Sequence, residues 1–382
     1  MPADEEEFDA RKAALGGGNK FVPPSIDPGD AEPEPRTRPE GSTYSASDIE
    51  SAGIRLAQEL EQYDFQPVIL FGNAASGKTS LLLSLFATIK TEFSLRTGLD
   101  QSQRLLPIDS EYGDFLHSQA EEFLGRKLYA FMDGKQPSAS RMEHPFFVPV
   151  DFAPNGKRLQ RFAFLESNGE WYRPDLSKEA VFPRLRKQVE DFISHYQRPL
   201  IFVHLLPYTQ EKTLSQSYDA AKDNDKLYEA QLAIVGALQA YRSIRINRHA
   251  DQHLVLVTKW DARTRTQADT FEALNGDRDD LLEFVESRYP QCLAAFQSLG
   301  NEGTHTALEP YCSGLMTENG VLALKRDNEL RPFVIEYPTN LWRWLYRRAS
   351  EAVGEGQIDP FPASKDEGSI IERFKRLLDK LF

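Results

Sequence analysis

The chain has 382 residues, of which 40% are hydrophobic and 27% are charged, and its formal net charge is −13. These proportions are those of a globular protein and exclude a collagen-like or wholly disordered chain. The acidic excess argues against a general nucleic-acid binder, because such proteins neutralise phosphates with Lys and Arg. Two cysteines, Cys292 and Cys312, are too few for a disulfide framework, and we expect both to be packing residues in a reducing cytoplasm.

Residues 1–43 are rich in proline and in acidic side chains. A segment of this composition buries too little apolar surface to offset its ordering entropy, so we expect a disordered tail. Its start is acidic where a secretory signal would be basic, and no apolar run in the chain reaches the ~18–20 residues that a membrane helix needs. We therefore expect a cytoplasmic protein without a transmembrane segment.

Folded structure is expected to begin at Ser47, where Ser47 and Glu50 have the spacing of a capping box for a helix that ends near Tyr63. From Pro67 onward, short apolar runs alternate with helical patterns. This alternation predicts an α/β fold, with a mostly parallel sheet and helices on both faces. The predicted strands are 68–71, 146–150, 161–165, 200–206, 253–258 and 304–311, and the predicted helices are 78–93, 179–197, 225–247 and 278–298.

Two regions depart from this alternation. A long insertion at about 97–145 contains a helical pattern near 111–131, and residues 320–336 predict a hairpin whose second strand is Phe333-Val334-Ile335, followed by a helix from Pro338. His204 lies inside an apolar run and is expected to be a core histidine with a backbone partner.

The chain is expected to divide into four parts. The tail at 1–43 precedes one domain at 44–350, a Gly/Pro-rich linker at 351–366 and a terminal helix at 367–382. The terminal helix is strongly amphipathic, which predicts that it docks on its own domain, binds a partner or lies on a membrane.

Residues Gly72 to Thr79 match the pattern G-x-x-x-x-G-K-[ST], between an apolar strand and an amphipathic helix. In such a loop the backbone amides point at nucleotide phosphates, and the N-terminus of the helix adds partial positive charge. Lys78 is expected to reach the β- and γ-phosphates, and Thr79 to place its hydroxyl on Mg²⁺. The residues expected to contact the nucleotide here are Gly72, Asn73, Ala74, Ala75, Ser76, Gly77, Lys78, Thr79 and Ser80.

A second motif follows the predicted strand 253–258. The strand runs directly into Thr258-Lys259-Trp260-Asp261, and with the phosphate loop upstream the sequence here resembles the P-loop GTPases of the Ras-like class. Their guanine-binding motif is Asn-Lys-x-Asp, of which Thr-Lys-x-Asp is a variant. The resemblance implies that Asp261 accepts hydrogen bonds from guanine and that the stem of Lys259 lies over the base. Thr258 stands where the family has the Asn that links this turn to the phosphate loop.

Two further segments extend the resemblance. Glu166-Ser167-Asn168-Gly169-Glu170 stands in the place of the family's Asp-x-x-Gly, so Glu166 would hold Mg²⁺ through water, Gly169 would meet the γ-phosphate and Glu170 would stand where Ras-like enzymes have a water-orienting Gln. Tyr311-Cys312-Ser313-Gly314 stands in the place of the family's Ser-Ala-x, with Ser313 at the base.

The insertion supplies the remaining candidates. Ser138 and Ser140 are candidates for the switch hydroxyl that completes the magnesium shell, and Arg141 is a candidate for an internal arginine finger. The Glu residues at 166 and 170 favour slow hydrolysis, because one adds a methylene at the magnesium position and the other adds negative charge near the γ-phosphate.

The resemblance covers about residues 67–315 and looks closest to bacterial Ras-like families such as the double-GTPase type of GTPase-associated conflict systems. It implies a switch that binds GTP and GDP with Mg²⁺, hydrolyses GTP slowly and acts on a protein partner. Two alternatives remain open. One is a pseudo-GTPase scaffold that holds nucleotide without turnover, and the other is an ATP-binding P-loop protein in which the motif at 258–261 is accidental.

Overall fold

The computed structural model describes most of the predicted domain. The described residues are 46–72, 76–92, 120, 122–132, 146–152, 159–166, 187–208, 220–260, 278–313, 315–316, 322–323, 325–326, 329–330, 332–352 and 354. The chain divides after Thr43, and all described residues belong to the second unit, Tyr44–Phe382. The expected tail and terminal helix lie outside the described residues, as do most of the insertion and most of the linker. Within the described ranges, no helix combines the length and apolar character needed to cross a membrane.

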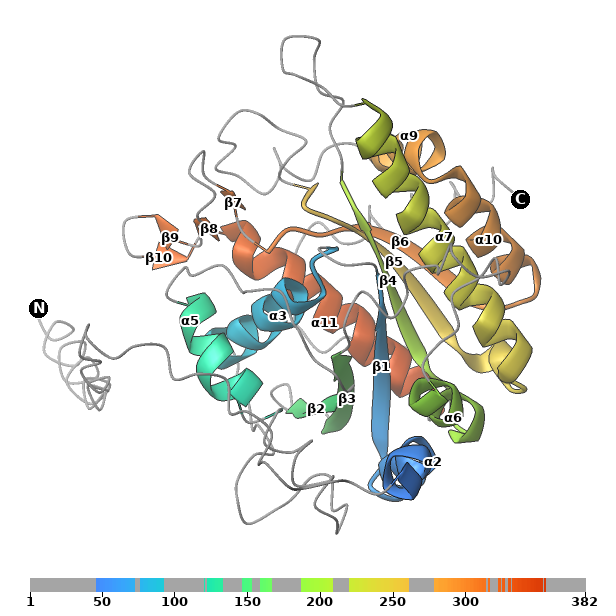
Figure 1. The fold of residues 1–382 in the computed structure, drawn as a ribbon. Coiled ribbons are helices and arrows are strands. Elements are labelled where there is room, and N and C mark those ends of the chain that lie inside the picture. The colour runs from blue at the N-terminus through green and yellow to red at the C-terminus, as the bar shows by residue number, and fades with distance from the viewer. Residues whose placement is uncertain are drawn as a thin grey trace, which may run out of the picture. The chain divides into compact units, whose positions relative to one another are not determined.

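A six-stranded sheet with the order β2-β3-β1-β4-β5-β6 forms the centre of the fold (Figure 1). Neighbouring strands are parallel, except that β2 is antiparallel to β3. The strands are β1 (Phe65–Phe71), β2 (Phe146–Phe152), β3 (Gln160–Glu166), β4 (Ile201–Pro207), β5 (Gln252–Thr258) and β6 (His305–Pro310). Each overlaps a predicted strand, and the α/β fold with a mostly parallel sheet is confirmed.

Helices cover both sides of this sheet. Figure 1 shows α3 and α11 on one side and α7, α9 and α10 on the other. The bounds are α2 (Ala46–Gln62), α3 (Lys78–Glu92), a π-helical turn η1 (Phe123–Lys127), α5 (Leu128–Met132), α6 (Lys187–His195), α7 (Ala220–Ile244), a short 3-10 turn η3 (Arg248–Ala250), α9 (Arg278–Arg288), α10 (Pro290–Asn301) and α11 (Pro332–Ala352). Because both faces are covered, the central strands consist of nearly continuous apolar residues.

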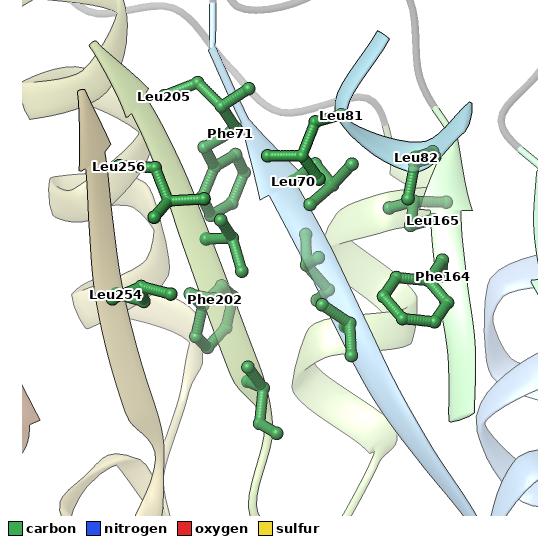
Figure 2. Close-up of a cluster of buried hydrophobic side chains, with 14 of the residues drawn as sticks. Leu70, Phe71, Leu81, Leu82, Phe164, Leu165, Phe202, Leu205, Leu254 and Leu256 are labelled. Carbon is green, nitrogen blue, oxygen red and sulfur yellow. The ribbon is translucent and has the colours of Figure 1, made fainter. Parts of the chain in front are cut away.

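Large apolar side chains of several strands form the core on both faces of the sheet. Figure 2 shows these side chains gathered along the central strands and against the first turns of α3. The labelled members are Leu70, Phe71, Leu81, Leu82, Phe164, Leu165, Phe202, Leu205, Leu254 and Leu256. All are buried, so the core fixes α3 against β1 and β3.

Helix α2 packs against α6, and this contact depends on a glycine. A Cβ atom added at Gly53 would lie 2.2 Å from the backbone oxygen of Gln188, which no side chain tolerates. Helix α2 begins at Ala46, one residue before the expected cap at Ser47. The predicted capping role of Ser47 is therefore wrong in register, because this residue lies inside the first turn.

The predicted helix at 278–298 is two helices. The chain breaks at Tyr289, whose ψ of 44° is not helical, and α10 starts with Pro290 at its first position. A residue that precedes proline is excluded from the helical region by the proline ring, so the break follows from the sequence.

The predicted second strand at Phe333-Val334-Ile335 is wrong, since these residues lie in the first turns of α11. Pro332 opens this helix, where its missing N–H costs nothing, and the helix continues through Pro338, which was expected to start it. The short strands form two other antiparallel pairs. They are β7 (Leu315–Met316) with β8 (Leu322–Ala323), and β9 (Lys325–Arg326) with β10 (Glu329–Leu330).

Two buried histidines pair with each other between the sheet and the helices α7 and α10. His204 Nε2 and His253 Nδ1 lie 3.0 Å apart, so the partner of His204 is a ring and not the expected backbone group. Their rings contact Tyr241 and Phe296. Burial lowers the pKa of His204 well below its ordinary value, and burial, followed by the charge of Arg242, lowers the pKa of His253 to about 3. Both rings are therefore neutral at neutral pH.

This pair makes stability depend on pH. Below a pH of about 6.5 the unfolded chain binds protons that the folded histidines do not, so the free energy of unfolding should fall by about 1 kcal/mol per histidine between pH ~7.5 and pH ~5.5. Urea unfolding at the two values measures the loss. A His204→Leu/His253→Leu double variant should lose less stability over this interval, whereas the exposed control His249→Leu should behave as wild type. Equal losses in all three proteins would contradict the prediction.

Candidate functional site

The predicted motifs meet at one edge of the sheet. Strands β1 and β4 are adjacent and parallel, and the chain leaves them in opposite directions, toward β3 from β1 and toward β5 from β4. Ligands of open α/β sheets bind outside the carboxyl ends of the strands at such a switch point. Gly72 follows β1, Glu166 ends β3, Thr258 ends β5 and Ser313 comes shortly after β6. The structure therefore brings these four positions to the same edge.

Both fixed glycines of the phosphate loop are required by geometry. A Cβ atom at Gly72 would lie 2.4 Å from Ser76 Oγ and 3.2 Å from Leu205 Cβ. Gly77 has a φ of 98°, in the left-handed region that favours glycine. The loop thus turns tightly between β1 and the start of α3. Asn73, Ala74 and Ala75 lie outside the described residues.

Lys78, the first residue of α3, is held inside this loop. Its side chain is buried, and its Nζ atom donates a hydrogen bond to the backbone oxygen of Gly72 at 2.6 Å. Ser76 Oγ is also buried and has no hydrogen-bond partner among the described residues. A buried polar atom without a partner is uncommon in folded proteins, and here it lies in the loop that the sequence assigns to phosphate. Ammonium and hydroxyl groups are both donors that suit an anion.

The first turn of α3 also favours the binding of an anion. The amide of Leu81 donates to Gly77 O at 2.8 Å, which begins the hydrogen-bond ladder of α3. The amides of Lys78, Thr79 and Ser80 precede this bond, in the first turn of the helix. No acidic side chain stands in this turn. The positive end of the helix dipole is therefore not neutralised locally, which favours a bound anion.

Thr258 links the second motif to the phosphate loop. Its hydroxyl donates a buried hydrogen bond of 2.7 Å to the backbone oxygen of Ser76. Threonine thus makes the contact with the phosphate loop from the position where the resemblance places asparagine. The end of β5 and the phosphate loop are joined directly.

The turn after β5 is held from several sides. Lys259 is exposed and has a φ of 58°, so its backbone lies in the left-handed region. Trp260 is buried against the rings of Tyr208 and Phe284, at centroid distances of 5.4 and 6.2 Å. The amide of Tyr208 donates to the backbone oxygen of Thr258 at 2.8 Å. Asp261, the predicted base-contacting residue, comes next and lies outside the described residues.

The segment after β6 lies beside this turn. The amide of Tyr311 donates to Val257 O at 2.8 Å, and the amide of Trp260 donates to Tyr311 O at 3.3 Å. Ser313 follows at a partly exposed position, while Cys312 is buried, as is Cys292. The two segments that the sequence assigns to the nucleotide base are therefore neighbours.

Several predicted residues are not placed. Ser138, Ser140, Arg141, Gly169 and Glu170 lie outside the described residues, and the structure describes the backbone of Glu166 but not its side chain. Among the described residues, no three His, Cys, Asp or Glu side chains form a group that could hold a metal ion. A magnesium site of the expected kind needs no such group, because it combines hydroxyl, carboxylate, water and phosphate oxygens. Thr79 and Glu166 are at the same sheet edge and suit this chemistry.

Sequence reasoning missed two parts of the site. Ser84 of α3 is buried and hydrogen-bonds Tyr311, and the rings of Tyr208 and Phe284 support Trp260. The available signal for Ser84 was a polar residue at an inward position within the apolar run from Leu81 to Phe86.

The strand, the glycine loop and the helix that begins with a buried lysine define an α/β P-loop NTPase fold. No family model and no curated protein sequence matches the chain. Among solved structures, a dimerization-deficient variant of Toc33 from Arabidopsis thaliana aligns at 13% identity and a TM-score of 0.33, over 80% of this chain and 93% of that one. Sup35 complexed with GDP aligns at 10% identity and a TM-score of 0.22, over 65% of this chain and 37% of that one. Neither alignment is close enough to support a function.

The close approach at Gly72 yields a stability prediction. Gly72→Ala should lower the free energy of unfolding by about 1–3 kcal/mol, because the added methyl group forces Ser76 and Leu205 apart. Urea unfolding measures this loss. Gly125→Ala is the control, since a Cβ atom there meets nothing within 4 Å. Adding Ser76→Ala to the Gly72 variant should restore part of the stability. A Gly72→Ala protein as stable as the Gly125 variant would show that the loop has room.

Proposed function

We propose that the chain is a guanine-nucleotide-binding P-loop protein that hydrolyses GTP slowly with Mg²⁺ and acts as a nucleotide-state switch for a protein partner. The observation that carries the proposal is the bond from Thr258 to Ser76, which joins a phosphate loop of complete motif to the turn that carries the guanine-binding sequence. One ligand with phosphates at one end and a base at the other suits this pairing.

The phosphate half acts through charge and backbone amides. Lys78 exchanges its bond to Gly72 O for phosphate oxygens, and the first amides of α3 bind the same group. Thr79 and Glu166 would hold Mg²⁺, with Ser140 as the third protein group, and the ion would supply positive charge beside the β- and γ-phosphates. Gly169 meets the γ-phosphate. Glu170 orients the attacking water, and its negative charge near the γ-phosphate keeps hydrolysis slow. Arg141 stabilises the charge that develops on the leaving phosphates.

The base half acts through hydrogen bonds and stacking. Lys259 is exposed and its stem covers the base, while Asp261 follows the buried Trp260 and accepts two hydrogen bonds from guanine. Ser313 contacts the base from the segment after β6. Adenine does not offer both donors to one carboxylate, so this half selects guanine.

The finer assignment rests on sequence resemblance. We place the chain in the Ras-like class, nearest to the bacterial double-GTPase type of conflict systems, and in the cytoplasm. Its partner contacts the switch segments and the terminal helix at 367–382. Competition binding of GTP, ATP and XTP separates this proposal from an ATP-binding protein. Hydrolysis measured with Mg²⁺ and the purified chain separates it from a pseudo-GTPase scaffold.

Lys78→Ala tests the phosphate half. The substitution removes the buried ammonium of the loop, and a charge-assisted contact contributes ~1.5–3 kcal/mol, so GDP affinity should fall at least roughly tenfold. Isothermal titration calorimetry measures the change. Lys187→Ala, at an exposed position of α6, should bind GDP as wild type. Unchanged affinity in the Lys78 variant would exclude the loop as a phosphate site.

Asp261→Asn tests the base half. The asparagine amide faces the guanine amine and loses one acceptor, so GDP binding should weaken by at least about tenfold. Xanthine has a carbonyl in place of that amine, so the same variant should gain XDP binding. Competition of GDP, ADP and XDP against a fluorescent nucleotide measures both changes. If wild type prefers ADP, or if the order of preference is the same in the variant, the guanine assignment is wrong.

A further inference from the structure

We propose that Tyr311 is a positioning residue, whose hydrogen bond to Ser84 fixes the distance between the base half and the phosphate half of the nucleotide site. This inference rests on the proposed function, since it assumes a ligand that spans both halves.

The bond joins two buried hydroxyl groups that lie far apart in the sequence. Ser84 Oγ and Tyr311 Oη are 2.5 Å apart, and both residues are at most 1% exposed. Ser84 Oγ also donates to Leu81 O at 2.9 Å. Because a hydroxyl has one hydrogen, the phenol of Tyr311 donates and Ser84 accepts. Burial raises the pKa of Tyr311 above its ordinary value, which keeps the phenol protonated.

On one side, Tyr311 is part of the base half. Its amide and carbonyl bond Val257 and Trp260, so its backbone is fixed to the turn that carries Lys259. Ser313 lies two residues further along the chain. Any shift of Tyr311 therefore shifts both segments that the proposed function assigns to the base.

On the other side, Ser84 is part of the phosphate half. It lies in the same helix as Lys78, about 9 Å along the axis at 1.5 Å per residue, and an α-helix transmits position over this length. Helix α3 is held in turn by α11, since Trp342 Nε1 donates to Leu85 O at 3.1 Å. Fixing Ser84 therefore fixes the residue that binds phosphate.

The Ser84 bond complements the bond from Thr258 to Ser76. The Thr258 bond joins the base turn to the loop, and the Tyr311 bond joins the segment after β6 to the helix. With both halves held at the correct separation, binding one end of a nucleotide presents the other end at high effective concentration. Loss of one bond should therefore lower the affinity for ligands that span both halves, and should leave the affinity for ligands that occupy one half unchanged.

Tyr311→Phe tests the inference, because it removes the hydroxyl and keeps the ring. We expect GDP to bind about threefold to tenfold more weakly, in line with the loss of one buried hydrogen bond, and to dissociate correspondingly faster. Affinities for Mg²⁺-pyrophosphate and for guanosine, each of which occupies one half, should stay as in wild type. Calorimetry and the release of a fluorescent GDP analogue measure these quantities.

Tyr196→Phe is the matched control. Tyr196 is a buried tyrosine whose hydroxyl donates one hydrogen bond of 2.7 Å, to Phe65 O at the start of β1, away from the site. The two variants should lose similar thermal stability, but only Tyr311→Phe should lose GDP affinity. A Ser84→Ala variant should lose as much GDP affinity as Tyr311→Phe does. The double variant should bind GDP no more weakly than either single variant.

Three results would overturn the inference. GDP affinity in Tyr311→Phe equal to that in Tyr196→Phe would reduce the bond to a structural role. If guanosine affinity fell as much as GDP affinity, the effect would be confined to the base half. Additive losses in the double variant would show that Ser84 and Tyr311 act separately. Failure of wild type to bind GDP would instead overturn the proposed function, and the inference with it.

Discussion

The close approach of the chain to itself at Gly72 is the constraint on which the site depends. Strand β1 lies at the centre of the sheet and is buried, and a Cβ atom at Gly72, where the chain leaves it, would meet the side chains of Ser76 and Leu205. This turn places Lys78 at the start of α3, buried and hydrogen-bonded to Gly72 O. The glycines thus have a conformational role that explains why the pattern is recognisable from sequence alone.

A buried ion pair holds the opposite edge of the sheet, where the parallel strands begin. Arg245 and Asp251 form a buried ion pair with a distance of 2.9 Å, and the guanidinium also donates to backbone oxygens of Ile193, Tyr196 and Arg198. Asp251 further accepts from Leu200 N and from Tyr241. Burial raises the pKa of Asp251, and its bonds to Arg245 oppose that rise. Because every polar atom of the pair has a hydrogen-bond partner, the pair fixes the two connections at this edge, from α6 to β4 and from α7 to β5.

The sequence predicted what local patterns determine and missed what tertiary packing determines. Apolar runs located the six strands of the central sheet, and the loop motif located the turn between β1 and α3. Phe333-Val334-Ile335 was assigned to a strand because three apolar residues fit either periodicity, and only packing of α11 on α3 decides between them. The partner of His204 and the contact of Ser84 with Tyr311 join residues 49 and 227 positions apart, and no local pattern encodes such pairs.

The bonds at the carboxyl edge also bear on how a nucleotide switch would work here. Hydrogen bonds join the end of β5 to three neighbours, namely Tyr208 after β4, Tyr311 after β6 and Ser76 in the loop. This side of the site is therefore one connected unit. On the other side, β2 pairs only with β3 among the described strands, and β3 ends at Glu166. A difference between GTP and GDP lies at the γ-phosphate, near Glu166 in the proposed function. Under the proposed function, this difference acts at the carboxyl end of β3 and not on the hydrogen-bonded turns that face the base.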